Sequence, residues 1–109
     1  MDKAAVLGIL ERFRVSLVKH GVNPSMMVLY GSYATGRQHE WSDIDVVVVS
    51  EDFEGKRFLD RIRPIVDAIY ELWEPIEAVP KTPEEWEEGS SLIVQFAKQG
   101  EVVYRAKSA

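Results

Sequence analysis

The chain has 109 residues, of which 46% are hydrophobic, and a formal net charge of −5. This length predicts one globular domain over residues 1–109 with a single core. The absence of cysteine excludes disulfide frameworks and cysteine-ligated zinc sites, and the two histidines, His20 and His39, form no metal-ligand pattern.

The charge and hydropathy pattern also narrow the class of protein. An acidic chain is not expected to bind nucleic acid directly, because domains that wrap its phosphates are usually basic. The N-terminal sequence MDKAAVLGIL lacks the basic and apolar regions of a secretory signal, and no apolar run approaches the length of a membrane span. We therefore expect a cytoplasmic protein without a membrane association.

In the first half of the chain, apolar spacing predicts a helix over residues 3–20 that stops near Gly21 and Pro24. The run 26–30 is a short apolar strand. The run Ile44–Val49 contains four valines and an isoleucine around Asp45. This β-branched composition is typical of a central strand covered on both faces.

In the second half, apolar residues from Phe58 to Ile69 recur at helical spacing, and Pro64 must either kink this helix or lie in its first turn. Residues 75–79 are predicted as a third strand. A capping box at 82–85 predicts the start of a short helix. Residues 92–98 are also predicted to be helical, and Gly100 ends that segment. Residues 102–104 are predicted to form the last strand. Alternating strands and helices predict an α/β (α+β) fold with one mixed β-sheet packed by helices.

Charges cluster in two places. Residues 71–88 contain seven glutamates and one lysine, and most of these glutamates are expected on a solvated acidic face. Lys56, Arg57 and Arg61 are expected on a solvated basic face where the second long helix begins.

Asp43 and Asp45 are separated by one residue at the start of the valine-rich strand. Because side chains alternate along a strand, both carboxylates lie on one side, with Cα atoms about 6–7 Å apart. Unpaired, they would repel each other and lose solvation, whereas a hard cation such as Mg²⁺ favours oxygen ligands and offsets both costs. Asp43 has an alternative role as a turn residue capped by Ser42, but Asp45 has no comparable structural explanation.

Gly31 and Ser32 directly follow the 26–30 strand. Glycine allows a close backbone approach, and free N–H groups at a helix start favour a phosphate. The structural alternative is a turn glycine followed by a serine N-cap. Arg37 could contact a triphosphate or lie in solvent, and Tyr33 and Trp41 are interpreted as packing or surface aromatics.

A phosphate cradle joined to a carboxylate pair by ten residues is typical of phosphoryl or nucleotidyl transfer. Gly31-Ser32, the ten-residue spacer and Asp43-Ile44-Asp45 resemble the signature of the polymerase-beta-like nucleotidyltransferase superfamily. The surrounding GSYATG and SDIDVVV resemble the minimal nucleotidyltransferases of bacteria and archaea, which are often encoded beside a HEPN-domain partner as the antitoxin of a two-gene module. The resemblance extends from Met26 to about Tyr104.

The resemblance implies a Mg²⁺-dependent transfer of a nucleoside monophosphate, AMP from ATP, to an acceptor hydroxyl, with pyrophosphate leaving. It assigns two Mg²⁺ ions to Asp43 and Asp45, and the NTP phosphates to Gly31 and Ser32. The superfamily usually takes a third carboxylate from a later strand, and Glu77 is the candidate in WEPIEAVP.

Alternatives remain for the third carboxylate. The family more often carries Asp than Glu at the position of Glu77. Glu74 is the second candidate for the third carboxylate. Alternatively, Glu77 is an exposed structural residue without a role in the site.

The expected acceptor is a hydroxyl, such as that of a tyrosine, on a HEPN-type toxin protein. A catalytically weak antitoxin that neutralises its partner by binding is the alternative. A less favoured alternative is an antibiotic-modifying nucleotidyltransferase, because such enzymes usually carry an extra domain for the acceptor. The base preference and a homo-oligomeric state are left open.

Overall fold

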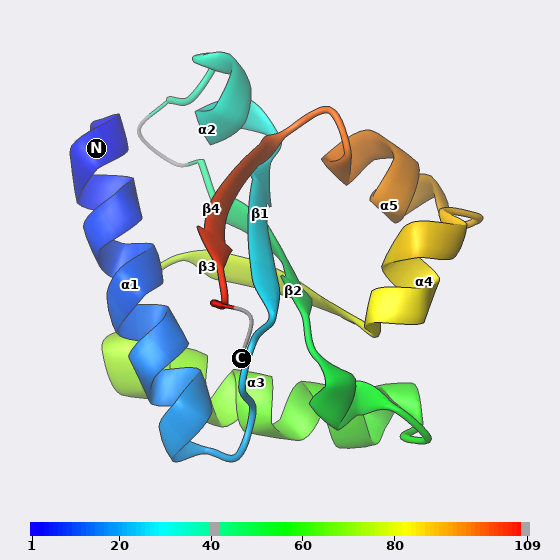
Figure 1. Cartoon of the computed structure of the whole chain (residues 1–109). Coiled ribbons are helices and arrows are strands. Elements are labelled where there is room, and N and C mark those ends of the chain that lie inside the picture. Colours follow the sequence, from blue (N-terminus) through cyan, green and yellow to red (C-terminus); the bar gives the residue numbers. More distant parts are fainter. Residues whose placement is uncertain (40–41, 108–109) are drawn as a thin grey trace.

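The computed structural model describes residues 1–39 and 42–107 and shows a four-stranded sheet with helices on both faces (Figure 1). In chain order the elements are α1 (Lys3–Lys19), β1 (Met26–Tyr30), α2 (Ser32–Thr35), β2 (Ile44–Val49), the 3-10 turn η1 (Glu51–Phe53), α3 (Phe58–Leu72), β3 (Ile76–Lys81), α4 (Pro83–Glu88), α5 (Leu92–Ala97) and β4 (Glu101–Arg105). The predicted α/β fold with a helix-packed sheet is confirmed. Trp41 lies outside the described residues.

The sheet has the strand order β3-β2-β1-β4. Strand β1 runs antiparallel to β2 and β4, whereas β2 and β3 are parallel, so the sheet is mixed as predicted. Strand β2 has an inner position, and every residue in it except Asp45 is buried. This burial is what its valine-rich composition predicts.

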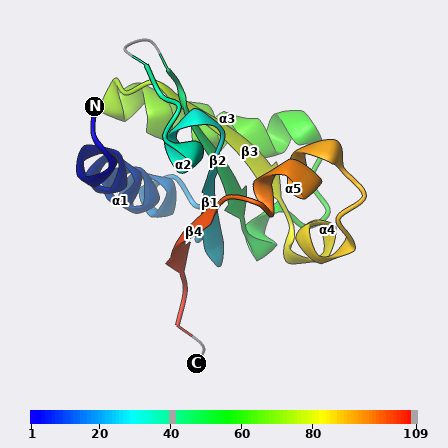
Figure 2. The same cartoon turned by 90° about the horizontal axis from the view of Figure 1, so that it is seen from above.

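The alternation of side chains along the strands divides the core into two layers. One layer packs against α1 and α3 and includes Met27, Leu29, Ile44, Val46 and Val48. The other packs against α4 and α5 and includes Met26, Val28, Tyr30, Val47 and Val49. Figure 2 shows α1 on one side of the sheet and α4 and α5 on the other. Asp45 and Glu77 share the parity of the second set, so both lie on the α4/α5 face of the sheet.

Pro64 lies in the interior of α3, as its seventh residue, and not in the first turn. Because proline has no N–H, it cannot donate the helical hydrogen bond to the carbonyl four residues earlier. The helix nevertheless continues to Leu72, since its buried residues Ile65 and Ala68 pack into the layer shared with α1. Tertiary packing therefore outweighs the local cost of the proline.

The other predicted boundaries differ from the observed ones by one or two residues. The first helix ends at Lys19, the third strand covers Ile76–Lys81 and the last covers Glu101–Arg105. The helix predicted over 92–98 ends at Ala97, ahead of Gly100. Among the described residues, the helices are too short or too polar to span a bilayer.

The predicted capping box of α4 is confirmed. The Glu85 N–H donates to Thr82 Oγ1 at 3.1 Å, and the Thr82 N–H donates to Glu85 Oε1 at 2.8 Å. Glu85 also accepts from Arg61 Nη1 at 2.6 Å. The expectation that Arg61 lies on a solvated basic face is therefore wrong, because it links α3 to the start of α4.

Five of the seven glutamates in residues 71–88 are exposed, as expected for a solvated acidic face, although three of the seven form ion pairs. Besides Glu85, Glu71 pairs with Lys19 at 2.8 Å and Glu74 pairs with Arg12 at 2.9 Å. The other four, Glu77, Glu84, Glu87 and Glu88, are exposed. The solvated acidic surface is therefore concentrated on β3 and α4.

Candidate active site

Three carboxylates, those of Asp43, Asp45 and Glu77, lie near one end of the α4/α5 face. Asp45 is the second residue of β2, and the parallel register places it directly beside Glu77 of β3. Neighbouring strands lie about 4.8 Å apart, so these side chains start close together on one face. Asp43 precedes β2 by one residue. Asp45 is half-buried, whereas Asp43 and Glu77 are exposed.

The pKa of Asp45 is shifted by its burial and by the neighbouring acids. Burial raises the pKa of Asp45 to about 6, and the neighbouring charges of Glu77 and then Asp43 add to the increase. Burial likewise raises the pKa of Tyr30 to about 12, with further contributions from Asp45 and Glu77. Tyr30 is paired with Asp45 in the β1–β2 register. The end of this face is therefore a region of negative potential.

The ion pairs recorded for the described residues do not involve this group of acids. Those within residues 1–39 and 42–107 are formed by other acids, and none includes Asp43, Asp45 or Glu77. Like charges held together on a partly buried strand favour protonation or a bound cation. The second candidate for the third carboxylate, Glu74, is held by Arg12 of α1 and precedes β3.

Gly31 is required at its position by Asp45. Its backbone has φ +75° and ψ −152°, a region that residues with a Cβ rarely adopt. A Cβ built there would overlap Asp45 Oδ2 and lie 3.2 Å from Asp45 Cγ. The close approach that the sequence suggested for a phosphate is made in this structure by the Asp45 carboxylate. Sequence reasoning missed this contact because it depends on the register of β1 against β2.

Helix α2 begins immediately after this contact. Gly31 is its N-cap and Ser32 its first helical residue, so the alternative in which Ser32 is the N-cap is wrong. Tyr33 is 4% exposed and packs in the α1 and α3 layer, which confirms its packing role. Arg37 follows α2 and is exposed. The structure thus brings Gly31 to the carboxylates and leaves Arg37 at the surface beyond the helix.

The donor set fits a hard divalent cation only when other ligands contribute. Among the described residues, no three His, Asp or Glu side chains are grouped closely enough to hold a metal ion. Mg²⁺ commonly uses one or two protein carboxylates together with water and substrate phosphate oxygens. An incomplete set of neighbouring carboxylates, none of which forms a recorded ion pair within the described residues, is compatible with that mode of binding.

A small cavity of about 100 Å³ lies beside these residues. Its lining includes Tyr30, Gly31 and Thr35 on one side and Phe96 of α5 on the other. The Tyr30 and Phe96 rings pack edge to face, with centroids 6.2 Å apart. Sequence reasoning did not identify Phe96 because its proximity depends on how α5 packs on the sheet.

A carboxylate cluster at the end of a mixed sheet, next to a glycine turn and a short helix, is an arrangement suited to metal-assisted transfer chemistry. Residues 10–102 match the sequence model of the nucleotidyltransferase domain family. The chain belongs to this family.

Known relatives agree with this membership. A protein of Methanocaldococcus jannaschii, named as a proposed protein adenylyltransferase, is 33% identical over 73 residues, which is 66% of this chain and 49% of that protein. The chain spans about half the length of the curated relatives it matches.

Two solved structures share the fold. A proposed nucleotidyltransferase from Sulfolobus solfataricus has a TM-score of 0.65 at 18% identity, over 78% of this chain and 74% of that one. A structure described as a toxin-antitoxin with AMP-PNP has a TM-score of 0.62 at 19% identity, over 89% and 74%.

We predict that Gly31→Ala destabilises the protein by about 1–3 kcal/mol more than Gly36→Ala, because it must displace the Asp45 carboxylate. Gly36 also has a positive φ, +73°, and a Cβ there meets nothing within 4 Å, so it is the control for replacing a glycine in open space. Its ψ of 17° differs from the −152° of Gly31, so the effect of the Asp45 carboxylate itself is isolated by repeating Gly31→Ala in an Asp45→Ala background. Urea denaturation of both variants measures the difference. Equal losses would show that Asp45 does not restrict residue 31, and adding Asp45→Ala should reduce the excess loss of Gly31→Ala.

We further predict that Asp45→Asn stabilises the metal-free protein in a pH-dependent way. The folded pKa of Asp45, about 6, lies above the unfolded value near 3.9, so the folded state binds more protons between these values. This residue's contribution to stability therefore falls as the pH rises from about 4 to 6. Melting temperatures in EDTA should diverge in favour of the variant over this window. A constant difference from pH 4 to 8 would contradict the prediction.

Proposed function

We propose that the protein is a Mg²⁺-dependent nucleotidyltransferase that moves AMP from ATP to a hydroxyl of a partner protein. The observation that carries this proposal is the register of Asp45 beside Glu77, with Asp43 nearby and Gly31 leaving room for the Asp45 carboxylate. In this proposal residues 1–109 act as one domain in the cytoplasm.

Each site residue has a defined role in the proposed reaction. Asp43 and Asp45 would hold two Mg²⁺ ions, assisted by Glu77, whose register position brings a third carboxylate to Asp45. When bound, Mg²⁺ polarises the α-phosphate and neutralises charge that develops on the departing pyrophosphate. Gly31 and Ser32, at the start of α2, would contact the NTP phosphates through backbone N–H groups. Arg37, exposed beyond α2, would contact the same phosphates.

The choice of a protein acceptor is supported by the names of the comparison proteins. The relative in M. jannaschii is named as a proposed protein adenylyltransferase, and one structural neighbour is described as a toxin-antitoxin with AMP-PNP. Together with the sequence resemblance to minimal nucleotidyltransferases, this supports an antitoxin that modifies a HEPN-type toxin. The negative potential at the site also disfavours a nucleic-acid acceptor.

A second candidate function is an antitoxin that neutralises its partner by binding alone. It is favoured by one observation, that the described acids do not form a closed group of three ligands. Glu77 is also exposed, as a structural surface residue would be. The two functions differ in whether Asp45 is needed for the effect on the partner.

We predict that the purified protein, given Mg²⁺ and ATP labelled at the α-phosphate, transfers label to the purified product of the adjacent gene. Asp45→Asn should reduce this transfer at least ~100-fold, because electrostatic groups at reacting phosphates contribute on this scale. Asp67→Asn, an exposed change on α3, is the matched control and should leave transfer unchanged.

Addition of EDTA to the wild-type reaction should stop labelling. Neutralisation of the partner by both wild type and Asp45→Asn, without any label on the partner, would instead establish the binding-only function.

A further inference from the structure

Helix α5 exposes an unusually apolar surface for its length. Its buried residues, Val94 and Ala97, face the sheet. On the outside, Leu92 is 81% exposed, Phe96 is 63% exposed and Ile93 is 39% exposed. Leu92 and Phe96 are four residues apart and therefore adjacent on the helix surface. We call these three residues the α5 apolar face. Contiguous exposed apolar surface commonly marks a binding site for another macromolecule.

The α5 apolar face adjoins the candidate active site. Phe96 packs against Tyr30, and the two residues line one cavity together with Gly31. Tyr30 is in turn paired with Asp45 across the β1–β2 ladder. A macromolecule bound on α5 would thus lie next to the carboxylates where transfer is proposed.

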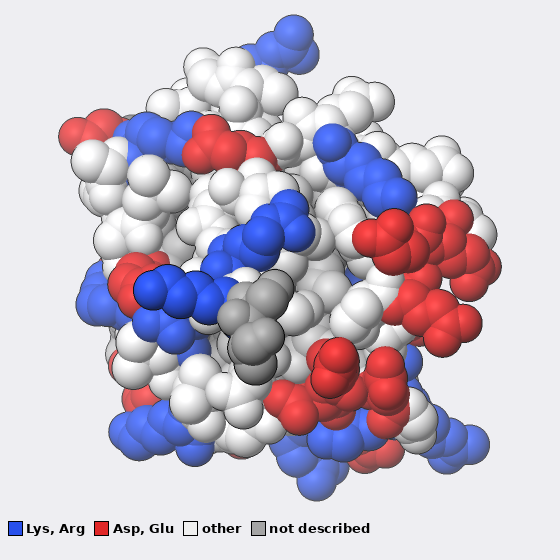
Figure 3. Space-filling model, viewed as in Figure 1, with Lys and Arg blue, Asp and Glu red and all other residues white. Residues whose placement is uncertain are grey.

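The helix next to this surface is acidic, whereas the C-cap of α5 is the exposed Lys98, whose ammonium lies over the Trp86 ring of α4. Helix α4 precedes α5 in the chain and exposes Glu84, Glu87 and Glu88. Figure 3 shows the acidic side chains gathered over α4, beside a region of uncharged atoms and one basic side chain where α5 lies in Figure 1. Because the carboxylates of the site are also negative, the surface is complementary to a basic partner and repels nucleic-acid phosphates.

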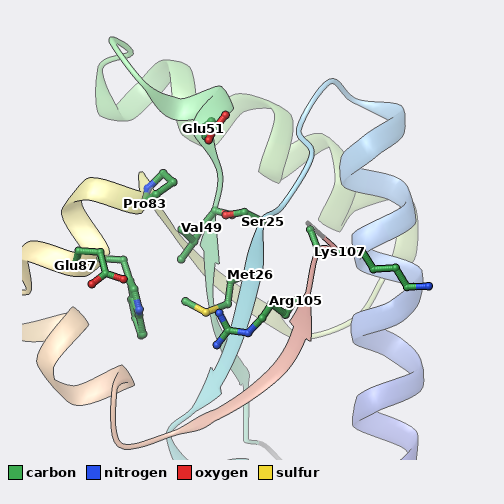
Figure 4. A pocket seen from close by; sticks show the side chains of 10 residues that line it. Ser25, Met26, Val49, Glu51, Pro83, Glu87, Arg105 and Lys107 are labelled. Carbon is green, nitrogen blue, oxygen red and sulfur yellow. The ribbon is translucent and has the colours of Figure 1, made fainter. Parts of the chain in front are cut away.

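Two other prominent surfaces among the described residues lie away from the site. Tyr70 and Trp73, which are 70% and 82% exposed, lie at the end of α3, a helix that packs on the opposite face of the sheet. The large cavity in Figure 4 has a volume of about 510 Å³ and lies at the other end of the α4/α5 face, next to Met26 and Val49. Its rim carries Arg105 and Lys107 together with Glu51 and Glu87, so it has no single charge.

We propose that the α5 apolar face and the acidic rim of α4 bind the protein that carries the acceptor hydroxyl, through an apolar patch bordered by Lys and Arg. This proposal rests on the function proposed above and adds the surface and the chemistry of the partner. The apolar contact provides affinity, and the acidic rim orients the partner and speeds association. The acceptor hydroxyl then lies beside Tyr30 and Asp45, where a nucleotide held by Gly31 and Ser32 can react with it.

Binding to the purified product of the adjacent gene tests this proposal without catalysis, because ATP is omitted. Leu92→Arg should weaken binding at least tenfold, since it removes apolar contact and places a positive charge against a basic partner. Leu59→Arg is the matched control, because Leu59 is 75% exposed and lies on α3, which packs on the opposite face of the sheet from α5. It should bind within about twofold of wild type. Wild-type binding should also weaken as salt increases.

The outcomes separate this proposal from the proposed function. If Asp45→Asn binds normally and Leu92→Arg does not, the docking surface is supported even when no label is transferred. If wild type binds and labels the partner but Leu92→Arg does so equally well, the docking surface is wrong and the transferase function stands. Absence of wild-type binding overturns the docking proposal. So does sedimentation showing that Leu92→Arg only converts a dimer of this chain to monomers, because the occupant would then be a second copy.

Discussion

The close placement of like charges around Asp45 is the constraint on which the rest of the site depends. Glu77 lies beside it in the parallel register, Asp43 precedes it in the chain, and partial burial raises its pKa to about 6. A fold of this size has a small net stability, so an uncompensated cost of this kind is significant. This electrostatic cost is explained if the carboxylates bind a cation that enters the site together with the substrate.

The remainder of the fold keeps this arrangement rigid. The strand that carries Asp45 is buried on both faces, between the α1 and α3 layer and the α4 and α5 layer. Strand β1 ends at Tyr30 and turns at Gly31, whose missing Cβ leaves space for the Asp45 carboxylate. The same turn starts α2, and the packing of α5 on the sheet places Phe96 against Tyr30, next to the site. The β1–β2 register therefore positions the carboxylates and the glycine turn, and the packing of α5 positions the proposed docking surface.

Much of the fold and part of the site could be predicted from sequence, and the reasons are physical. Strand β2 and the capping box of α4 depend on local composition, which is visible in the chain. The spacing of Asp43 and Asp45 likewise depends only on strand geometry. The role of Gly31 could not be predicted, because it depends on which residue of a neighbouring strand faces it. The ion pair of Arg61 could not be predicted for the same reason, since its partner Glu85 lies 24 residues away in the chain.

The central claim is that the Asp45 carboxylate serves to bind Mg²⁺ and nucleotide and does not stabilise the fold. Thermal melting of wild type and Asp45→Asn, each in EDTA and in Mg·ATP, tests it most directly. The account predicts that Mg·ATP raises the melting temperature of wild type, because a ligand that binds only the folded state stabilises it, and that this gain is absent in the variant. In EDTA the variant should be at least as stable as wild type. A variant less stable than wild type by about 1–3 kcal/mol in both conditions would contradict the claim, because that result is expected when a buried structural hydrogen-bond partner is lost.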